Sequence, residues 1–282
     1  MDCLPYVFYE SVVSMLEQKD LKTICSNFNK SVLQSFCQDR LEYHRGVTLH
    51  IHHPSITNSG QAIFIVDQNS HRVDIRSKFY IDAVIVAGPT EKDYNEKLVY
   101  SEGLLERALK TYSKFFDRKV SFDMDDDMLH DRQFAEMVLR SNLAKIPYSD
   151  INMAYVSHLS DQFLNRQVQF GMLKSLFLLG NIPSTTLECV VDLLAQAQFK
   201  YLSLTNMEEV EMPFVEKLLQ KWKSTTNFGF SIYGRASSSL CFKKLLKKND
   251  DMWVMKHPSD RYLETVFSRS VGLICISGHC RP

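Results

Sequence analysis

The segment LKSLFLLGNIPSTTLECVVDLLAQAQFKYLSLTN, residues 173–206, decides how the chain is expected to fold. It contains two short runs in which apolar and polar residues alternate, one around Leu176 and the other around Leu202. Such alternation is typical of strands with one buried face. Between the runs, Thr186–Ala197 carries apolar residues at the i, i+3, i+4 and i+7 spacing of an amphipathic helix. The segment therefore predicts a strand, a helix and an equivalent second strand.

Both strands resemble the leucine-rich-repeat strand template, in which leucines precede an asparagine. The first matches at Leu173, Leu176, Leu178 and Asn181, and the second, with its asparagine one place early, at Phe199, Leu202, Leu204 and Asn206. Leu202 lies 26 residues after Leu176, inside the roughly 20–29-residue repeat window. We therefore expect Leu176, Leu178, Leu202 and Leu204 to face one shared core. The alternative is an ordinary α/β sandwich with coincidental spacing.

The same alternation of strands and helices extends outward from this segment. The predicted strands are Val47–His52, Ala62–Asp67, Ile81–Val86, Val120–Asp123, Ile151–Met153, Phe228–Ile232 and Val271–Ile276, the first two forming a possible hairpin. The predicted helices are Glu102–Phe116, Asp131–Arg140, Val156–Arg166 and Pro213–Trp222, and a fainter third unit continues into Leu240–Leu246. Stacked units of this kind place parallel strands on one surface and helices on the other. The expected class is α/β, with an irregular stack of βα, leucine-rich-like units over residues 46–282.

Residues 1–45 have a different texture and predict a three-helix module. The helices are expected over Tyr6–Glu17, Leu21–Phe28, with Asp20 as a cap, and Lys30–Tyr43. A module of this size buries little apolar surface alone, so it should lean on the following region or on a partner.

The ordered series in this module resembles the F-box. It consists of Leu4-Pro5, Val12-Val13, Leu16, Asp20-Leu21 and Ile24-Cys25, covers about residues 3–43, and lacks the tryptophan common near the end of that motif. The remainder, with FVEKLLQKW and MWVMKHPSDRYLETV, is similar in texture to the F-box-associated families expanded in nematodes.

The resemblance implies a substrate-recognition subunit of a Skp1–cullin–F-box ubiquitin ligase. Leu4, Pro5, Val12, Leu16 and Leu21 would contact a Skp1-like adaptor, and the C-terminal units would bind an unknown protein target. Three alternatives stay open: helices that merely cap the stack, a protein-interaction scaffold without a ligase role, and an enzyme whose site is assembled from scattered residues.

Composition excludes several other classes of protein. The 282 residues contain 33 Lys+Arg and 33 Asp+Glu, so there is no basic excess for binding nucleic acid or an anionic membrane. No apolar stretch approaches the roughly 18–20 residues of a membrane span, and the N-terminus lacks the pattern of a signal peptide.

Seven scattered cysteines indicate reduced core residues. The expected location is cytoplasmic or nuclear, and not secreted.

The candidate metal sites all fail on spacing, so neither a metal nor a cofactor is expected. The acids of residues 123–127 lack the glycine and glutamate of a calcium loop, and we expect them to cap the next helix. His50, His52 and His53 read as solvated histidines of an edge strand, and Cys275, His279 and Cys280 have no second ligand pair.

Catalytic motifs are also missing from the sequence. There is no G-x-S-x-G elbow, phosphate loop or H-E-x-x-H pair, and only 10 glycines. The lysines of residues 243–248 are expected on the solvated side of a helix. The sequence therefore predicts a protein that is not an enzyme.

Overall fold

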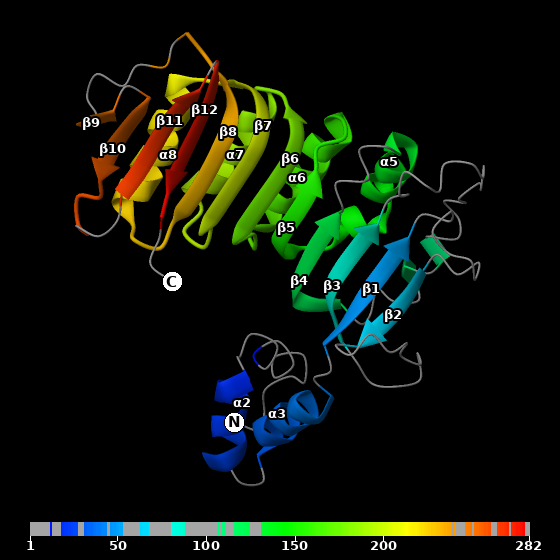
Figure 1. Ribbon diagram of the computed structural model, residues 1–282. Coiled ribbons are helices and arrows are strands. Elements are labelled where there is room, and N and C mark those ends of the chain that lie inside the picture. Colours follow the sequence, from blue (N-terminus) through cyan, green and yellow to red (C-terminus); the bar gives the residue numbers. More distant parts are fainter. Residues whose placement is uncertain are drawn as a thin grey trace.

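The structure, a computed structural model, describes residues 12, 18–27, 31–43, 46–52, 63–67, 80–87, 106–107, 109–110, 116–124, 131–238, 240, 246–249, 251–260, 264–270 and 272–279. Within these ranges the chain forms one large sheet, a layer of helices against it and a separate pair of N-terminal helices (Figure 1). The predicted α/β class is confirmed. None of the helices in these ranges has the length and apolar character needed to cross a membrane.

The sheet has twelve strands in the order β2-β1-β3-β4-β5-β6-β7-β8-β12-β11-β10-β9. Their bounds are β1 Gly46–His52, β2 Ile63–Asp67, β3 Tyr80–Ala87, β4 Phe116–Met124, β5 Tyr148–Ala154, β6 Ser175–Ile182, β7 Tyr201–Val210, β8 Gly229–Ala236, β9 Leu246–Asn249, β10 Met252–Lys256, β11 Glu264–Ser270 and β12 Leu273–Gly278. From β1 through β3 to β8 the neighbours are parallel and follow the chain. The antiparallel β1–β2 pair confirms the expected hairpin.

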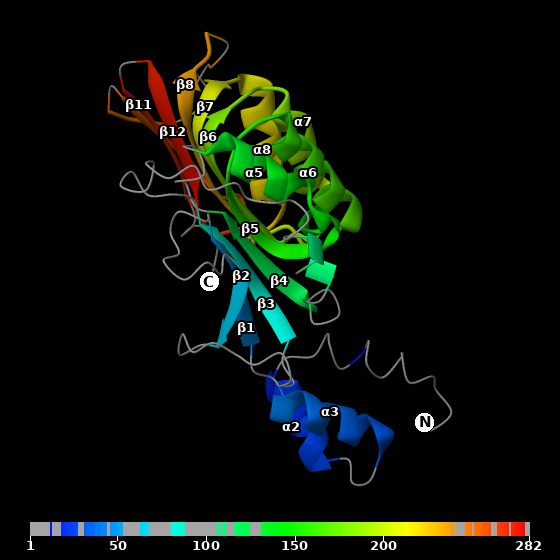
Figure 2. The same cartoon turned by 90° about the vertical axis from the view of Figure 1, so that its right-hand side faces the viewer.

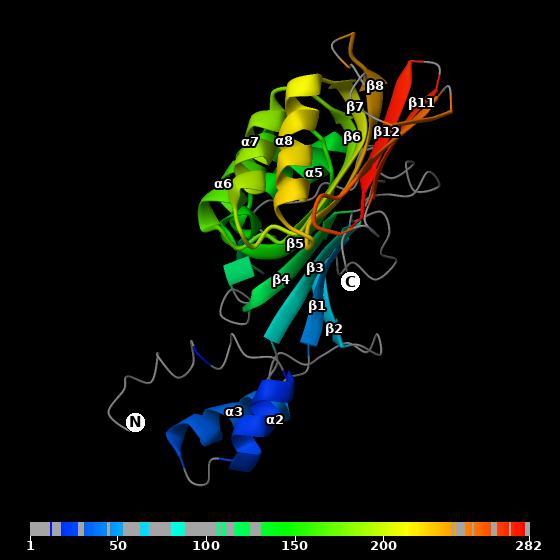
Figure 3. The ribbon, with the colours of Figure 1, turned by 90° about the vertical axis from the view of Figure 1, so that its left-hand side faces the viewer.

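Four helices cover one face of this sheet and none of the described helices covers the other (Figures 2 and 3). They are α5 Arg132–Arg140, α6 His158–Phe170, α7 Thr186–Ala195 and α8 Met212–Ser224. A short 3-10 helix, Asn142–Lys145, follows α5. One-sided coverage follows from the sequence, because each strand and each helix has a single apolar side and only one pairing of those sides buries both.

The register of the parallel strands explains the leucine pattern. Ile151, Leu176, Leu202 and Phe230 are neighbours across β5 to β8, and all four are buried. Spacings of 25, 26 and 28 residues therefore bring equivalent positions side by side. Leu178 and Leu204 belong to the same core, so the predicted shared core of the four leucines is confirmed.

The core between the sheet and its helices also contains aromatic clusters. The ring centroids of Phe122 and Tyr148 are 5.1 Å apart, and those of Phe122 and Phe163 are 5.2 Å apart. These contacts join β4, β5 and α6. The Tyr148 hydroxyl donates to the Leu143 carbonyl at 3.1 Å, so its one polar atom is satisfied within the core.

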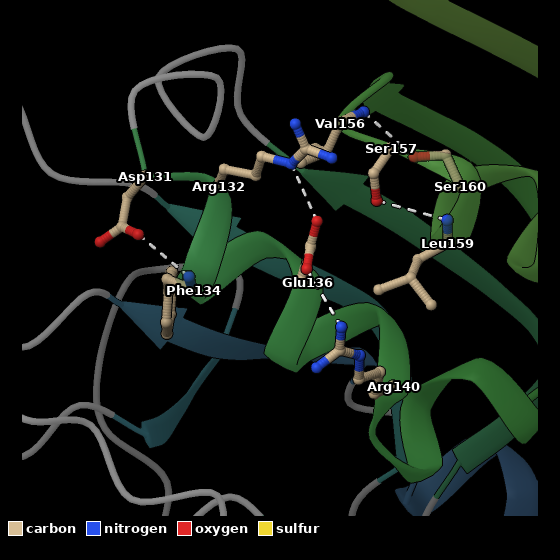
Figure 4. Close-up of polar contacts among 9 residues, drawn as sticks. All are labelled: Asp131, Arg132, Phe134, Glu136, Arg140, Val156, Ser157, Leu159 and Ser160. Atoms are coloured by element: carbon tan, nitrogen blue, oxygen red, sulfur yellow. Dashed lines mark hydrogen bonds and ion pairs between the residues drawn. The ribbon is translucent and has the colours of Figure 1, made fainter.

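Helices α5 and α6 begin at side-chain caps (Figure 4). The Asp131 carboxylate accepts from the backbone N–H of Phe134 at 3.0 Å, and the Ser157 hydroxyl accepts from that of Leu159 at 3.3 Å. We expected residues 123–127 to cap α5, which is wrong for Asp123, because that residue lies in strand β4. The cap comes instead from the residue directly before the helix.

The two N-terminal helices are α2, Gln18–Asn27, and α3, Val32–Tyr43. They pack on one another around Leu21 and Cys37, in a small core separate from that of the sheet. Two of the three predicted helices are thus present, although Asp20 lies in the first turn of α2 and does not cap it. The predicted helix Tyr6–Glu17 lies outside the described residues except for Val12, which is helical.

The C-terminal part departs from the predicted stack of βα units. After β8 the sheet continues with antiparallel strands only: β12 pairs with β8, β11 with β12, β10 with β11 and β9 with β10. Lys247 and Lys248 lie in strand β9, so their predicted helix is wrong. A short strand bearing lysines suits the outer edge of a sheet, because charge discourages pairing with another chain.

This antiparallel part is tied to the last helix by polar contacts. The indole N–H of Trp222 in α8 donates to the carbonyl of His279 at 3.0 Å. The His257 ring lies edge-on to the Trp222 indole, and its Nε2 is 2.8 Å from the Trp222 carbonyl. Strands β10 and β12 are therefore attached to α8 through His257 and His279, the residues that directly follow them.

Candidate functional site

The sheet face opposite the helices, hereafter the open face, is the main candidate for function. Along each parallel strand the residues between the core positions point to it. One row across β4, β5, β6, β7, β8 and β12 consists of Asp123, Asn152, Phe177, Ser203, Ser231 and Ser277. Each member is exposed or half-buried. The row gives the open face a continuous sequence of side chains available to a partner.

Aromatic side chains stand on this face. Phe177 is 41% exposed and Tyr233 is 39% exposed. Tyr201, on β7, lies beside Phe177 with the ring centroids 5.0 Å apart. Large exposed aromatic side chains on a rigid sheet are typical of a binding surface, because they offer apolar area at little entropic cost.

Small hydroxyl side chains separate these aromatics. Ser203, Ser231 and Ser277 are direct neighbours across β7, β8 and β12, and Thr205 lies next to Tyr233. None of these side chains is large, so in the middle of the open face the strand backbone lies close to the surface. A partner could reach the backbone level there while it contacts Phe177 on one side and Tyr233 on the other.

Two acidic side chains on the open face are held by neighbours. Asn152 Nδ2 donates to Asp123 Oδ1 at 3.0 Å. Ser149 Oγ donates to Asp150 Oδ2 at 2.6 Å, and Ser175 donates to the other oxygen of Asp150. Burial raises the pKa of the Asp123 carboxyl above its usual range, and the hydrogen bond from Asn152 opposes that shift. Asp123 is thus a partly desolvated carboxyl beside an amide.

Asp123 and Asn152 line a pocket of about 390 Å³ at the carboxyl ends of β3, β4, β5 and β6. Its described lining is Ile85, Asp123, Met124, Asn152, Met153, Ala154 and Leu179. A second pocket, of about 560 Å³, lies around Glu106 and Lys145, where Glu106 accepts from the backbone N–H of Asn142 at 3.0 Å. Only the first pocket adjoins the open face.

The residues predicted to contact an adaptor fall largely outside this description. Leu4, Pro5 and Leu16 lie outside the described residues, and Val12 is half-buried. Leu21 is 1% exposed and packs against α3. A partner could therefore touch the Leu21 side chain only if α2 and α3 separated.

The structure corrects two minor predictions about histidine and cysteine. β1, which carries His50 and His52, has strands on both sides, so these are not residues of an edge strand; His53 lies outside the described residues. Cys37 and Cys189 are buried free thiols as predicted, whereas Cys275 is exposed. Within the described ranges no group of His, Cys, Asp or Glu could hold a metal ion.

Of the open-face residues, the alternation around Leu202 predicts only Ser203 as outward-facing, and Phe177, Asp123 and Asn152 were not identified from the sequence. Phe177 sits in the run LFLL, where it looks like one more core residue, and only strict alternation around Leu176 and Leu178 could have marked it as outward-facing. Asp123 and Asn152 are 29 residues apart and meet only through the register of β4 and β5.

Comparison of the chain with protein-family models, with curated proteins and with solved structures finds no match.

Proposed function

We propose that the chain is a protein-recognition subunit that binds a protein target through the open face of its sheet. The observation that carries this proposal is the pair of exposed aromatics Phe177 and Tyr233, with the half-buried Tyr201 beside Phe177, on a sheet face that no described helix covers. Interfaces are enriched in tyrosine and phenylalanine, and a few such anchors supply most of the binding energy. Targets would contact the aromatics around the shallow serine floor.

We further propose that residues 1–45 attach this subunit to a Skp1-like adaptor, as in a Skp1–cullin–F-box ubiquitin ligase, and that the βα units are leucine-rich-like repeats. The series Leu4-Pro5 and Leu16 supports the adaptor contact, while Leu21 packs inside the module. The separate small core of α2 and α3 supports it as well, because a pair of short helices with its own core buries little apolar surface alone.

The adaptor contact is tested with a double variant, Leu4→Ala with Pro5→Ala. Purified full-length chain and a Skp1-type adaptor are mixed, and complex formation is measured by co-purification and calorimetry. The double variant should weaken binding by about 2 kcal/mol or more, as expected for interface anchors. Thermal unfolding must show that the sheet stays folded, which makes the loss specific to binding.

A matched variant on the other surface, Phe177→Ser with Tyr233→Ser, should bind the adaptor as the natural chain does. If the natural chain binds no Skp1-type adaptor, or the Leu4/Pro5 variant binds unchanged, the ligase role is wrong. The remaining function would be that of an interaction scaffold. Loss of adaptor binding in both variants would also contradict the proposal that residues 1–45 bind the adaptor and the open face binds the target.

A further inference from the structure

We propose that the pocket at the carboxyl ends of β3, β4, β5 and β6 receives the side chain of a lysine or arginine of the protein target. This inference rests on the proposed function, since the pocket adjoins the open face. It names the chemistry of the partner: a cationic side chain that enters beside Asp123, flanked on the target by an apolar residue that contacts Phe177.

The hydrogen-bonding capacity of the pocket favours a cation. Asn152 Nδ2 donates to Asp123 Oδ1 at 3.0 Å, and this is the only hydrogen bond of either side chain within the described residues. The second carboxylate oxygen of Asp123 and the amide oxygen of Asn152 are therefore acceptors for a ligand. Lysine and arginine side chains carry only donors, so they complement a site in which acceptors predominate.

The walls of the pocket suit the alkyl part of such a side chain. Ile85 and Leu179 present apolar groups beside the two polar residues. A lysine or arginine buries its methylene stem along apolar surface while its charged end makes polar contacts. The volume of about 390 Å³ is near the lower end of the roughly 300–1,000 Å³ of small-molecule pockets, which suits one long side chain.

The charge around the pocket is not neutralised by the neighbouring strands. The sequences of β3, β5 and β6 contain no lysine or arginine, and the two cationic residues of β4, Arg118 and Lys119, lie toward the amino end of that strand, away from Asp123. A cation supplied by the target would therefore meet Asp123 without competition from these strands. Burial of Asp123 strengthens the attraction, because a partly desolvated carboxylate interacts more strongly with a charge than a fully hydrated one.

The register sets the distance from the pocket to the nearest aromatic anchor. Asn152 pairs with Asp123 on one side and with Phe177 on the other. Two strand spacings separate Asp123 from Phe177, or roughly 9–10 Å. A target that places a cation and an apolar side chain this far apart on one surface would occupy both positions.

The first experiment uses a single amino acid as the probe. Nα-acetyl-lysine methylamide is titrated into isotope-labelled full-length chain, and the side-chain amide resonances of Asn152 are followed by NMR. They should shift in a saturable way, whereas the uncharged Nα-acetyl-norleucine methylamide should leave them unmoved. The shift should disappear in Asp123→Asn and persist in the matched control Asp150→Asn, whose carboxyl lies on the same face outside the pocket. Equal shifts with both probes, or persistence in Asp123→Asn, would overturn the proposal.

The second experiment separates this inference from the proposed function. A displayed random peptide library is selected on the natural chain, with the Phe177→Ser/Tyr233→Ser variant as the counter-target. Selected peptides should contain lysine or arginine. Asp123→Asn should lower their affinity for the chain roughly tenfold to a hundredfold. Peptides whose binding depends on Phe177 but is unchanged in Asp123→Asn would refute the cation pocket and would still support the open face as a binding surface. If no peptide depends on the open face while lysine amide still binds, the protein-recognition role fails and the pocket stands as a cation site.

Discussion

On the helix-covered face of the sheet, Leu202 of β7 is 0% exposed, whereas its neighbour Ser203 is half-buried on the open face. The covered face is built from leucine, isoleucine, valine and phenylalanine across β1 to β8. The open face combines serines, a desolvated carboxyl and exposed aromatic rings. Every second residue thus serves the core, and the residues between are free to serve a partner. The covered side of these strands therefore carries stability, and under the proposed function the open side of the same strands carries recognition.

The largest expected effect is at Leu202. Leu202→Ala should lower the free energy of unfolding by roughly 2–5 kcal/mol, because it removes buried methyl groups and leaves a cavity between β7 and the helices. Ser203→Ala, one residue away on the open face, should change it by less than about 0.5 kcal/mol. Urea denaturation measures the free energy of unfolding of both variants. Equal losses would mean that the two faces are assigned incorrectly.

Overpacking at Gly278 is expected next. A Cβ built on Gly278 would lie 2.4 Å from Cε1 of Phe230, whose ring belongs to the core. Gly278→Ala should therefore cost about 1–3 kcal/mol of stability, as the ring or the strand shifts. The control is Ser277→Ala, which alters the open face of the same strand and should be close to neutral. Thermal unfolding with no difference between these variants would contradict the close contact of β12 and β8.

Thr265 offers a smaller effect of opposite sign. Its hydroxyl is buried on β11, opposite Gly278, and has no hydrogen-bond partner among the described residues. Thr265→Val replaces that hydroxyl with a methyl group of similar size and should stabilise the fold by about 1 kcal/mol. Thr265→Ser keeps the hydroxyl, removes the methyl group and should destabilise. If valine destabilises instead, the hydroxyl is satisfied in solution.

The smallest effect, and the most informative about the open face, concerns Asp123. Burial raises the pKa of the Asp123 carboxyl, so the folded chain holds a proton on this carboxyl more tightly than the unfolded chain does. This contribution to stability is fully present below the unfolded pKa and is lost as pH rises through the folded pKa. Asp123→Asn should match the natural chain in acid and become the more stable of the two as pH approaches neutrality.

Urea denaturation at several pH values between about 3 and 7 measures this difference. Asp150→Asn is the matched control: it should lower stability at neutral pH, because two serine hydroxyls donate to that carboxylate. A loss of stability in Asp123→Asn at neutral pH would make Asp123 a structural residue of the sheet. A gain would leave its charge without a role in folding, as expected of a residue retained for binding.

The parallel part of the fold could be predicted from sequence because its signals are local. Alternation around Leu176 and Leu202 identifies strands, the i, i+3, i+4 spacing identifies α7 and α8, and the 26-residue spacing of Leu176 and Leu202 predicts that they are neighbours. Boundaries were less accurate. The predicted helix ending at Phe116 was too long, because Phe116 already begins β4.

The antiparallel part could not be predicted in the same way. Met252–Lys256 and Glu264–Ser270 are short strands without a repeated spacing, and their positions depend on which distant strand each one pairs with. The pairing of β12 with β8 joins Ile276 to Ile232 across 44 residues. The candidate site was hidden for the same reason: Asp123, Asn152 and Phe177 become neighbours only through register.

The strand order near the C-terminal end has a consequence for synthesis on the ribosome. β8 pairs with β12, the last described strand to emerge, and the earlier strands β9, β10 and β11 lie farther out. During translation the edge of β8 therefore stays unpaired until residue 278 has left the exit tunnel. An open edge of this kind invites pairing with another nascent chain. Translation arrested after residue 236 has left the exit tunnel and before residue 273 has left it should thus yield the most aggregation-prone nascent chains, and emergence of β12 should remove that hazard.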